Sequence, residues 1–146
     1  MKYEWDAKKE IMTMVEYSKL QNGSDIRVVA LPLVAAEPVN LTEEAAGQIG
    51  RAFAAWLVER CGKPAEELRI AVGRDSRLSG PSLQRAVLTG LVAMGAVAAD
   101  CGMASTPAMF MATVLPGCDF DGAVMITASH LPQNRNGLKF FTREGG

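Results

Sequence analysis

The stretch Ile126-Thr127-Ala128-Ser129-His130-Leu131-Pro132, followed by Asn136-Gly137-Leu138-Lys139, is the most informative part of the chain. It comes directly after an apolar run, residues 123–126, that is typical of a buried strand. A serine hydroxyl, the single histidine of the protein and a lysine therefore lie in or near the polar loop at the end of a strand. In α/β proteins such strand ends carry reactive groups, because a rigid strand directs its loop into a crevice.

These three side chains suit phosphate chemistry. A hydroxyl can carry a phosphoryl group, an imidazole can move a proton near neutral pH, and an ammonium group is a fixed cation. Ser and Thr at a strand end can also simply form a turn, and neighbours on an extended backbone point apart, so His130 need not bond Ser129. A Ser-His-Asp hydrolase is disfavoured because its base must reach the nucleophile and no G-x-S-x-G sequence is present.

The pattern of apolar residues around this loop predicts an alternation of strands and helices. Strands are expected over residues 26–34, 68–72, 96–99, 122–127 and 137–142, and helices over residues 42–62, 79–95 and 106–115. Thr42 is expected to cap the first helix, with Glu43 and Glu44 in its first turn. This order predicts an α/β fold, a three-layer α/β/α sandwich with a mostly parallel mixed sheet.

The length predicts one domain over residues 23–146, preceded by an N-terminal arm or loose amphipathic helix over residues 1–22. Helical spacing predicts buried side chains on the first two helices and on the strand before Ser129, which itself should be accessible. The expected buried residues are Ile49, Phe53, Leu83, Val87, Leu91, Met94 and Val124. Methionines 103, 109 and 111 are expected to fill the core on a helix, rather than to form a cofactor or soft-metal site.

Composition excludes several classes of partner. Hydrophobic residues make up 49% of the chain and charged residues 21%, and 15 basic against 16 acidic residues give a net charge of −1. This balance does not favour nucleic acid or an anionic membrane as a partner, and no apolar run reaches the length of a transmembrane helix. The N-terminus mixes both charges without an apolar segment, which is not typical of a secretory signal.

The three cysteines, Cys61, Cys101 and Cys118, form no C-x-x-C pair and leave an odd count. Metal-ligand and disulfide interpretations are therefore poor. We expect buried thiols in a reducing, cytoplasmic environment.

Four motifs in order carry a resemblance to a known family. The Ser129 loop with Asn136-Gly137-x-Lys139 resembles the phosphoserine loop of the α-D-phosphohexomutases, the phosphoglucomutase/phosphomannomutase family. Gly23-Ser-Asp-Ile-Arg27 resembles the N-terminal Asp-Ile-Arg motif of that family, and Gly73-Arg-Asp-Ser-Arg-Leu-Ser-Gly80 resembles its Gly-Arg-Asp-x-Arg segment. Thr106-Pro107 resembles the Thr-Pro pair that lies between that segment and the active serine. The resemblance runs from about Leu20 to Thr142, which is nearly the whole chain.

The chain departs from the family pattern at three positions. Val28 stands where a glycine usually follows Asp-Ile-Arg; it does not easily adopt a positive φ, which could change how Arg27 approaches the site. Leu131 replaces the commoner asparagine, and Arg135 stands where an aromatic residue is frequent. The last two are interpreted as variation between subgroups.

The resemblance implies reversible phosphoryl transfer between O1 and O6 of a hexose phosphate, through a phosphoserine and a hexose bisphosphate intermediate that also acts as activator. The carrier maps to Ser129. Arg27 and Lys139 would be active-site cations that bind phosphate and assist proton transfer, and His130 a phosphate-binding group that carries or orients a proton. Mg²⁺ would bind a phosphate oxygen on Ser129 and neutralise its charge.

Members of the family have four domains. The acidic Asp-x-Asp-x-Asp-type metal loop belongs to the second, the sugar-reading loop to the third and a substrate-phosphate site to the fourth. We therefore expect this chain to be the first domain, lacking domains II–IV and the carboxylates that complete the Mg²⁺ site, and to be inactive alone. Apolar surface that packs on the missing domains could lead the isolated domain to self-associate.

The alternative is a stand-alone, non-catalytic domain that binds a phosphorylated ligand or a partner protein. An acidic metal loop encoded downstream of this domain would distinguish the two, because it would favour the mutase.

Arg74, Asp75 and Arg77 lie between an expected strand and the start of an expected helix, where they could form an anion pocket. For Arg74 and Asp75 we favour an ion pair that holds the loop, because interleaved opposite charges usually satisfy one another.

Overall fold

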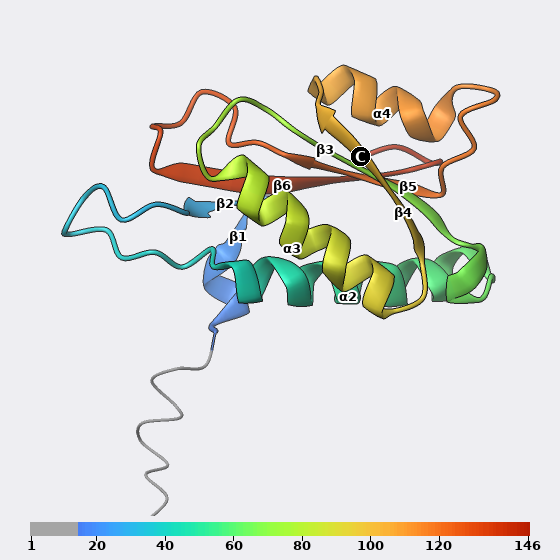
Figure 1. The fold of residues 1–146 in the computed structure, drawn as a ribbon, viewed down its shortest axis with the longest axis horizontal. Coiled ribbons are helices and arrows are strands. Elements are labelled where there is room, and N and C mark those ends of the chain that lie inside the picture. The colour runs from blue at the N-terminus through green and yellow to red at the C-terminus, as the bar shows by residue number, and fades with distance from the viewer. Residues whose placement is uncertain (1–14) are drawn as a thin grey trace, which may run out of the picture.

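A six-stranded sheet forms the middle of three layers in the computed structural model, which describes residues 15–146. Helices α2 (Glu43–Cys61) and α3 (Gly80–Ala93) cover one face of the sheet, and helix α4 (Thr106–Val114) covers the other (Figure 1). The expected α/β/α sandwich is confirmed. Most of the expected N-terminal arm or helix lies outside the described residues, and its last part forms a 3₁₀ turn, η1 (Tyr17–Leu20).

The strands are β1 (Gln21–Asn22), β2 (Asp25–Val29), β3 (Arg69–Arg74), β4 (Val97–Met103), β5 (Gly122–Ile126) and β6 (Arg135–Thr142). Their order across the sheet is β1-β2-β6-β5-β3-β4. β3 pairs in parallel with both β4 and β5, whereas β6 pairs antiparallel with β5 and β2, and β1 antiparallel with β2. Strands β2, β3, β4 and β5 therefore run in one direction, and insertion of β6 makes the pairing antiparallel over one half of the sheet.

The first expected strand is shorter than the sequence indicates. β2 ends at Val29, and the N–H groups of Ala30 and Leu31 both donate to the Asn134 carbonyl instead of continuing a ladder. Pro32, which has no N–H, follows at this bend. β4 is longer than expected because it continues to Met103 alongside β3.

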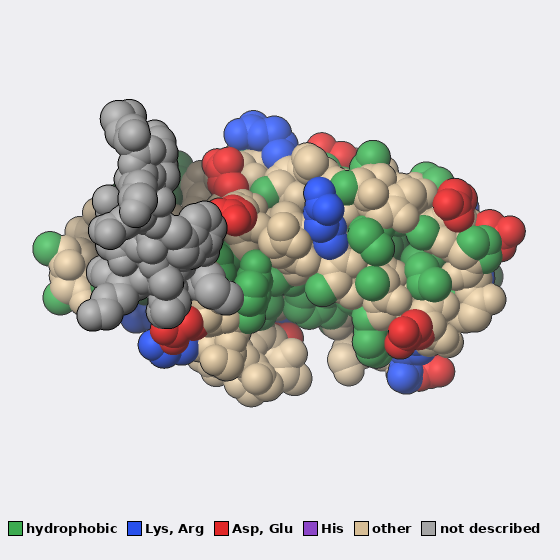
Figure 2. Space-filling model, turned by 90° about the horizontal axis from the view of Figure 1, so that it is seen from below, with side chains coloured by type: hydrophobic (Ala, Val, Ile, Leu, Met, Phe, Trp, Pro, Cys, Tyr) green, Lys and Arg blue, Asp and Glu red, His purple; other side chains and the backbone are tan. Residues whose placement is uncertain are grey.

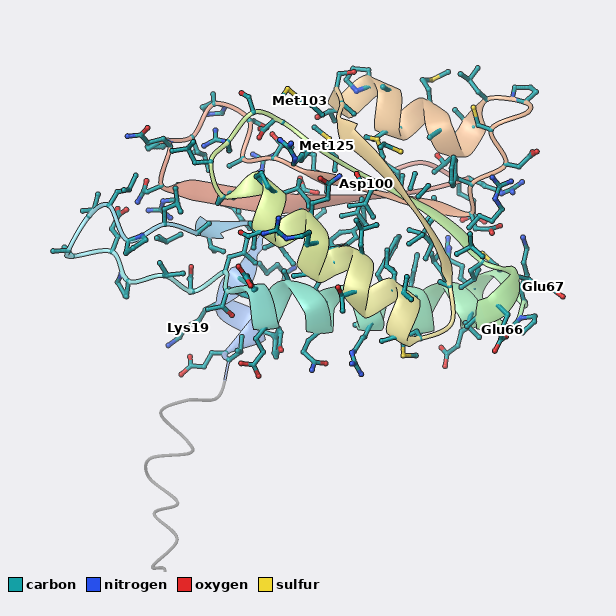
Figure 3. The ribbon with its side chains drawn as sticks, in the orientation of Figure 1. Lys19, Glu66, Glu67, Asp100, Met103 and Met125 are labelled. Atoms are coloured by element: carbon teal, nitrogen blue, oxygen red, sulfur yellow. The ribbon has the colours of Figure 1, made fainter. Side chains whose placement is uncertain are left out.

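Successive side chains of β3 and β5 point to opposite faces of the sheet, as they do in every β-strand. Ile70 and Val124 belong to the main core with Leu57, Leu83 and other residues of α2 and α3. The intervening positions form a smaller cluster against α4, and Figure 3 shows Met125 on that side of the sheet. The members of this cluster are Ala71, Met109, Ala123 and Met125.

Three methionines that were expected in the core are exposed. Met94 is 37% exposed, because it is the C-cap of α3 and the chain turns away at Gly95 with a φ of +95°. Met103 is 65% exposed because it lies at the end of edge strand β4 rather than on a helix (Figure 3), and Met111 is also exposed; Met109 is buried.

Ile49 is partly rather than fully buried, because it lies on the flank of α2 beside an apolar groove. The groove has a volume of about 350 Å³ and is lined by Ile26, Ile49, Ala52, Phe53, Trp56 and Phe140. Figure 2 views the molecule from the side of α2 and α3, where hydrophobic side chains lie among charged side chains of both signs. The other expected core residues, Phe53, Leu83, Val87, Leu91 and Val124, are buried.

None of the helices in residues 15–146 is long and apolar enough to cross a membrane. The three cysteines are free thiols. The expectation that they are buried is wrong, because none of them is fully buried. Cys101 is exposed because it lies on the edge strand β4, and Cys61 and Cys118 are half-buried.

The register of β2 against β6 places Arg27 opposite Gly137. The two backbones approach so closely that a Cβ atom at Gly137 would lie 1.9 Å from the Ile26 carbonyl oxygen and 2.9 Å from that of Thr127. Gly137 is thus the point at which β2 and the beginning of the Ser129 loop meet across one strand.

Truncating Phe53 tests the main core. Phe53 is 7% exposed and packs against Phe140, with ring centroids 5.0 Å apart, so Phe53→Ala should lower the free energy of unfolding by about 3–5 kcal/mol. The control Val92→Ala, at an exposed position of α3, should change it by less than about 0.5 kcal/mol in the same urea titration. A loss below about 1 kcal/mol for Phe53→Ala would mean that α2 is wrongly placed.

Gly137→Ala tests the approach of β2 to the Ser129 loop. The added methyl group meets backbone atoms that cannot move independently, so we expect a loss of about 3 kcal/mol or more in the free energy of unfolding. Gly23→Ala is the control: it has a φ of +64° but open space around its Cβ position, and should cost only about 1–2 kcal/mol. Equal effects of the two substitutions would contradict the register described above.

Candidate active site

Ser129 lies in the loop that connects β5 to β6 and is exposed. Its backbone has a φ of +56°, a left-handed conformation that costs a non-glycine residue about 1–3 kcal/mol unless its surroundings stabilise it. Its N–H donates to Oγ1 of Thr127 at 3.0 Å. Within residues 15–146 its own hydroxyl has no hydrogen-bond partner, so the side chain is presented to solvent.

Asp75 connects the Ser129 loop to the loop after β3. One carboxylate oxygen of Asp75 accepts from the Thr127 hydroxyl at 2.6 Å, and the other accepts from the Arg77 N–H at 3.1 Å. The Asp75 N–H donates to the Ile126 carbonyl at 3.1 Å. Because Thr127 in turn accepts from the Ser129 N–H, the position of Ser129 is coupled to that of Asp75.

The guanidinium group of Arg77 binds the Ser129 loop directly. Its Nη2 donates to the carbonyls of Ser129 (2.9 Å) and Leu131 (2.7 Å), and its Nη1 donates to those of Pro132 (2.8 Å) and Arg135 (3.1 Å). The Nε atom lies 3.5 Å from the Asp75 carboxylate, and the side chain is only 12% exposed. All four N–H groups on the terminal nitrogens of Arg77 are therefore bound to the loop, while Nε makes only the charge contact with Asp75.

The ion pair that we expected between Arg74 and Asp75 is formed instead by Arg77 and Asp75. Arg74 donates to Gln84 Oε1 at 3.1 Å and to the Asp75 carbonyl at 3.2 Å, because its side chain points toward the buried start of α3. The interpretation that these charges hold a loop is confirmed, with a different pairing.

The far end of the Ser129 loop is bound to the segment after β2. Asn134 donates to one carboxylate oxygen of Glu37 at 2.7 Å, and Arg135 donates to the other at 3.1 Å. The hydrogen bond from Asn134, with the charge of Arg135 acting in the same direction, holds the pKa of Glu37 below its usual range against the opposing effect of desolvation. Arg135, at a position where the family often has an aromatic residue, thus forms an ion pair here.

Asn136 lies at the start of β6 and is completely buried. Its Nδ2 atom donates to the Ser79 hydroxyl at 2.8 Å, and its Oδ1 atom accepts from the Gly137 N–H at 2.8 Å. Ser79 directly precedes α3, so Asn136 ties the helix start to the end of the loop.

Arg27 and Lys139 meet on neighbouring strands around Asp25. Lys139 Nζ lies 2.7 Å from Asp25 Oδ2, and Arg27 Nη2 lies 3.3 Å from the same atom. Lys139 pairs with Met125, whose side chain belongs to the α4 side of the sheet, and alternation places Arg27 on that side too. Among the described residues only Nη2 of this guanidinium donates a hydrogen bond, so Arg27 keeps capacity for an anion.

Val28 does not disturb this arrangement. It needs no positive φ, lies in regular strand β2 and is buried in the main core. Since successive strand residues face opposite sides, Val28 packs toward α2 and α3 while Arg27 faces away from them.

His130 is exposed, and its imidazole makes no hydrogen bond within the part of the chain that the structure describes. It does not bond Ser129, as expected for neighbours that point apart. An open groove of about 350 Å³ runs beside Ser129, and its lining contains neither Arg27, nor His130, nor Lys139. The structure thus brings Arg27 and Lys139 together through Asp25, while Ser129 stands on its own loop. The groove is lined by Asp75, Ser76, Arg77, Leu78, Ser129, Leu131 and Gln133.

The residues described here do not by themselves form a Mg²⁺ site. Within residues 15–146 no group of three or more His, Cys, Asp or Glu side chains is placed to hold a metal ion. Asp75, the carboxylate near Ser129, already accepts from Thr127 and Arg77. Ser129 would offer a single oxygen, whereas Mg²⁺ requires several in octahedral geometry.

Asp25 and Thr127 were not among the candidate site residues taken from the sequence. Both belong to the quoted motifs, but neither could be assigned a partner without the strand register. Asp25 stands two residues before Arg27, and this spacing on one face of a strand was the available signal.

Comparisons with known proteins give a consistent result. The family model of phosphoglucomutase/phosphomannomutase, alpha/beta/alpha domain I, matches residues 19–146. A phosphoglucosamine mutase from Pediococcus pentosaceus is 40% identical over 105 residues, covering 72% of this chain and 23% of the relative. One from Clostridium perfringens is 42% identical over 105 residues, covering 72% of this chain and 22% of the relative.

The fold has a solved counterpart. The crystal structure of a phosphoglucomutase/phosphomannomutase family protein from Burkholderia thailandensis superimposes with a TM-score of 0.71 and 33% sequence identity. The match covers 89% of this chain and 27% of that chain, so the chain spans about a quarter of the length of the proteins it resembles. With the loop, the sheet and the ordered motifs all in place, the chain belongs to the phosphoglucomutase/phosphomannomutase family, of which residues 19–146 form the α/β/α domain I.

Proposed function

We propose that this domain supplies the catalytic serine of a phosphohexomutase that interconverts hexose 1-phosphates and hexose 6-phosphates. The observation that carries the proposal is Ser129: an exposed hydroxyl without a partner in residues 15–146, on a loop whose backbone is bound at both ends. A phosphoryl carrier needs this combination, because the oxygen must be free while its position is fixed.

In the proposed reaction, Ser129 carries a phosphoryl group at the start. A hydroxyl of the hexose phosphate attacks phosphorus, a P–O bond to the sugar forms, and the P–O bond to Ser129 Oγ breaks. The proton of the sugar hydroxyl is transferred to Ser129 Oγ, which leaves as a hydroxyl group. The resulting hexose bisphosphate reorients, and its other phosphoryl group returns to Ser129 by the reverse step.

The side chains around Ser129 have separate proposed roles. Arg27 and Lys139 balance the charge of a phosphate dianion, and Asp25 keeps the two cations together in the absence of substrate. His130 is free to carry or orient a proton. Neither cation lines the groove at Ser129, so we propose that substrate bridges the two positions.

Completion of the site requires other domains in this proposal. Mg²⁺, which would neutralise charge on the phosphoserine, would need carboxylates that the described residues do not provide around Ser129. Because the chain spans about a quarter of its relatives, we also assign sugar recognition to the remainder of a full-length mutase.

The names of the relatives support an order in which substrates should be tested. The curated relatives named above are phosphoglucosamine mutases, so glucosamine phosphate is the first substrate to test, followed by glucose and mannose phosphates. We propose no choice among them from this domain.

Removing the carrier should abolish turnover. In a full-length mutase that contains this chain, Ser129→Ala should lower kcat by more than about 1,000-fold, because no other group can accept the phosphoryl group in the same place. The control Ser18→Ala, an exposed serine of η1, should leave kcat unchanged. Full turnover of the Ser129→Ala enzyme would overturn the proposal.

Removing either cation should weaken the reaction without unfolding the domain. Arg27→Met and Lys139→Met should each reduce kcat/KM by about 100-fold or more, since each loses a charge-assisted contact to phosphate. Lys19→Met, on an exposed surface of η1, serves as the control and should have no effect. Normal kinetics in both site variants would remove Arg27 and Lys139 from the site.

The chain alone should not turn over. A coupled assay of the purified chain with Mg²⁺, a hexose 1-phosphate and a bisphosphate activator should show no isomerisation, because phosphoryl transfer depends on positioning by groups that this domain lacks. Turnover on the order of 1 s⁻¹ would show instead that one domain, or an oligomer of it, forms a complete site.

A further inference from the structure

We infer that Arg77 is a positioning residue for the Ser129 loop rather than a phosphate ligand. The importance of Arg77 to the reaction rests on the proposed function, but its role in holding the loop rests on its contacts alone. These contacts favour the loop-holding interpretation of the motif over an anion pocket.

The terminal donors of Arg77 leave no capacity for an anion. Its two terminal nitrogens donate to four carbonyl oxygens of the loop at 2.7–3.1 Å, and its Nε faces the Asp75 carboxylate. A guanidinium group has five N–H donors in a fixed plane, and these contacts use the four that its terminal nitrogens carry. The fifth, on Nε, is buried beside Asp75 and makes no hydrogen bond within residues 15–146. Binding phosphate through the terminal nitrogens would require breaking bonds to the loop, whereas at Arg27 only Nη2 donates to another residue of the described chain.

The four acceptors are spaced along the whole loop. The carbonyls of Ser129, Leu131 and Pro132 come from its tip, and that of Arg135 from the first residue of β6. These groups belong to a segment with little regular structure, whose carbonyls would otherwise point in various directions. A single planar cation directs all four toward one point, and so determines the course of the backbone.

This arrangement accounts for the conformation of Ser129. The φ of +56° is unfavourable for serine and persists only if the surroundings stabilise it. Arg77 binds the carbonyl of Ser129, and Thr127, held by Asp75, binds its N–H. Both peptide groups that flank Ser129 are therefore fixed by the motif after β3.

The direction of the next N–H group follows from peptide geometry. In a planar trans peptide the N–H points opposite to the preceding carbonyl. Since the Ser129 carbonyl faces Arg77, the N–H of His130 faces away from the guanidinium, and it has no acceptor within residues 15–146. Arg77 thereby leaves this donor available to an oxygen of a phosphoryl group on Ser129.

Nuclear magnetic resonance of the labelled chain tests the inference without requiring activity. A positive φ brings the amide and α protons of Ser129 close together, which gives a strong intraresidue NOE. In Arg77→Met that NOE should fall to the intensity of an ordinary residue, and amide exchange of Ser129 and Leu131 should accelerate by at least about tenfold. Amides of β5, such as Val124, should be unchanged.

Arg85→Met is the matched control, because Arg85 is an exposed arginine of α3 whose side chain makes no hydrogen bond to the loop among the described residues. It should keep the NOE and the slow exchange. If Arg77→Met does not fold, Asp75→Asn replaces it, since this change weakens the ion contact with Arg77 while conserving shape; it should show the same loss to a smaller extent.

Retention of the strong NOE and of slow loop exchange in a folded Arg77→Met or Asp75→Asn chain would overturn the inference. The outcome is separate from that of the proposed function. A mutase that turns over without Ser129 would refute the function and leave this result intact, because neither NMR measurement depends on a phosphoryl group.

Discussion

A single guanidinium group, that of Arg77, connects the two loops on which the candidate site depends. Four carbonyl oxygens of the Ser129 loop converge on it, and Asp75 beside it binds Thr127 and, through Thr127, the N–H of Ser129. The loops follow β3 and β5, which are adjacent parallel strands, so their carboxyl ends meet at one edge of the sheet. The Gly-Arg-Asp-x-Arg motif is therefore the support of the serine loop.

Strand β6 positions the other candidate site residues relative to the Ser129 loop. It runs antiparallel between β5 and β2, so that Lys139 lies beside Asp25 and Gly137 opposite Arg27. The near contact of backbones at Gly137 holds β2 against the base of the Ser129 loop. α4 packs on β3, β5 and β6 of this face, and the cations lie on the same face toward β2. The geometry leaves two separate elements, a held serine and a pair of cations, which the substrate connects in the reaction that we propose.

Much of this architecture could be predicted from the sequence. Helical spacing in residues 42–62 and the Thr42 cap located α2, and the apolar run before Thr127 located β5, because both patterns are local. The motifs also identified Ser129, Arg27 and Lys139 as candidates. Local patterns could not predict that β6 is inserted antiparallel, that Met94 ends its helix in solvent, or that Asp25 joins two cations. The first and the last depend on which strands pair, and in which register, and the exposure of Met94 depends on where the chain turns at Gly95. The periodicity of one segment specifies neither.

Identifying the phosphorylated residue is the most direct test of the central claim, which is that Ser129 carries the phosphoryl group on a loop of fixed conformation. A full-length mutase containing this chain would be incubated with a hexose 1,6-bisphosphate, digested and analysed by tandem mass spectrometry. The account predicts one phosphoryl group, on the peptide that contains residues 127–135 and at Ser129. A phosphoryl group at any other residue, or an enzyme that turns over without forming a phosphorylated protein, would contradict it.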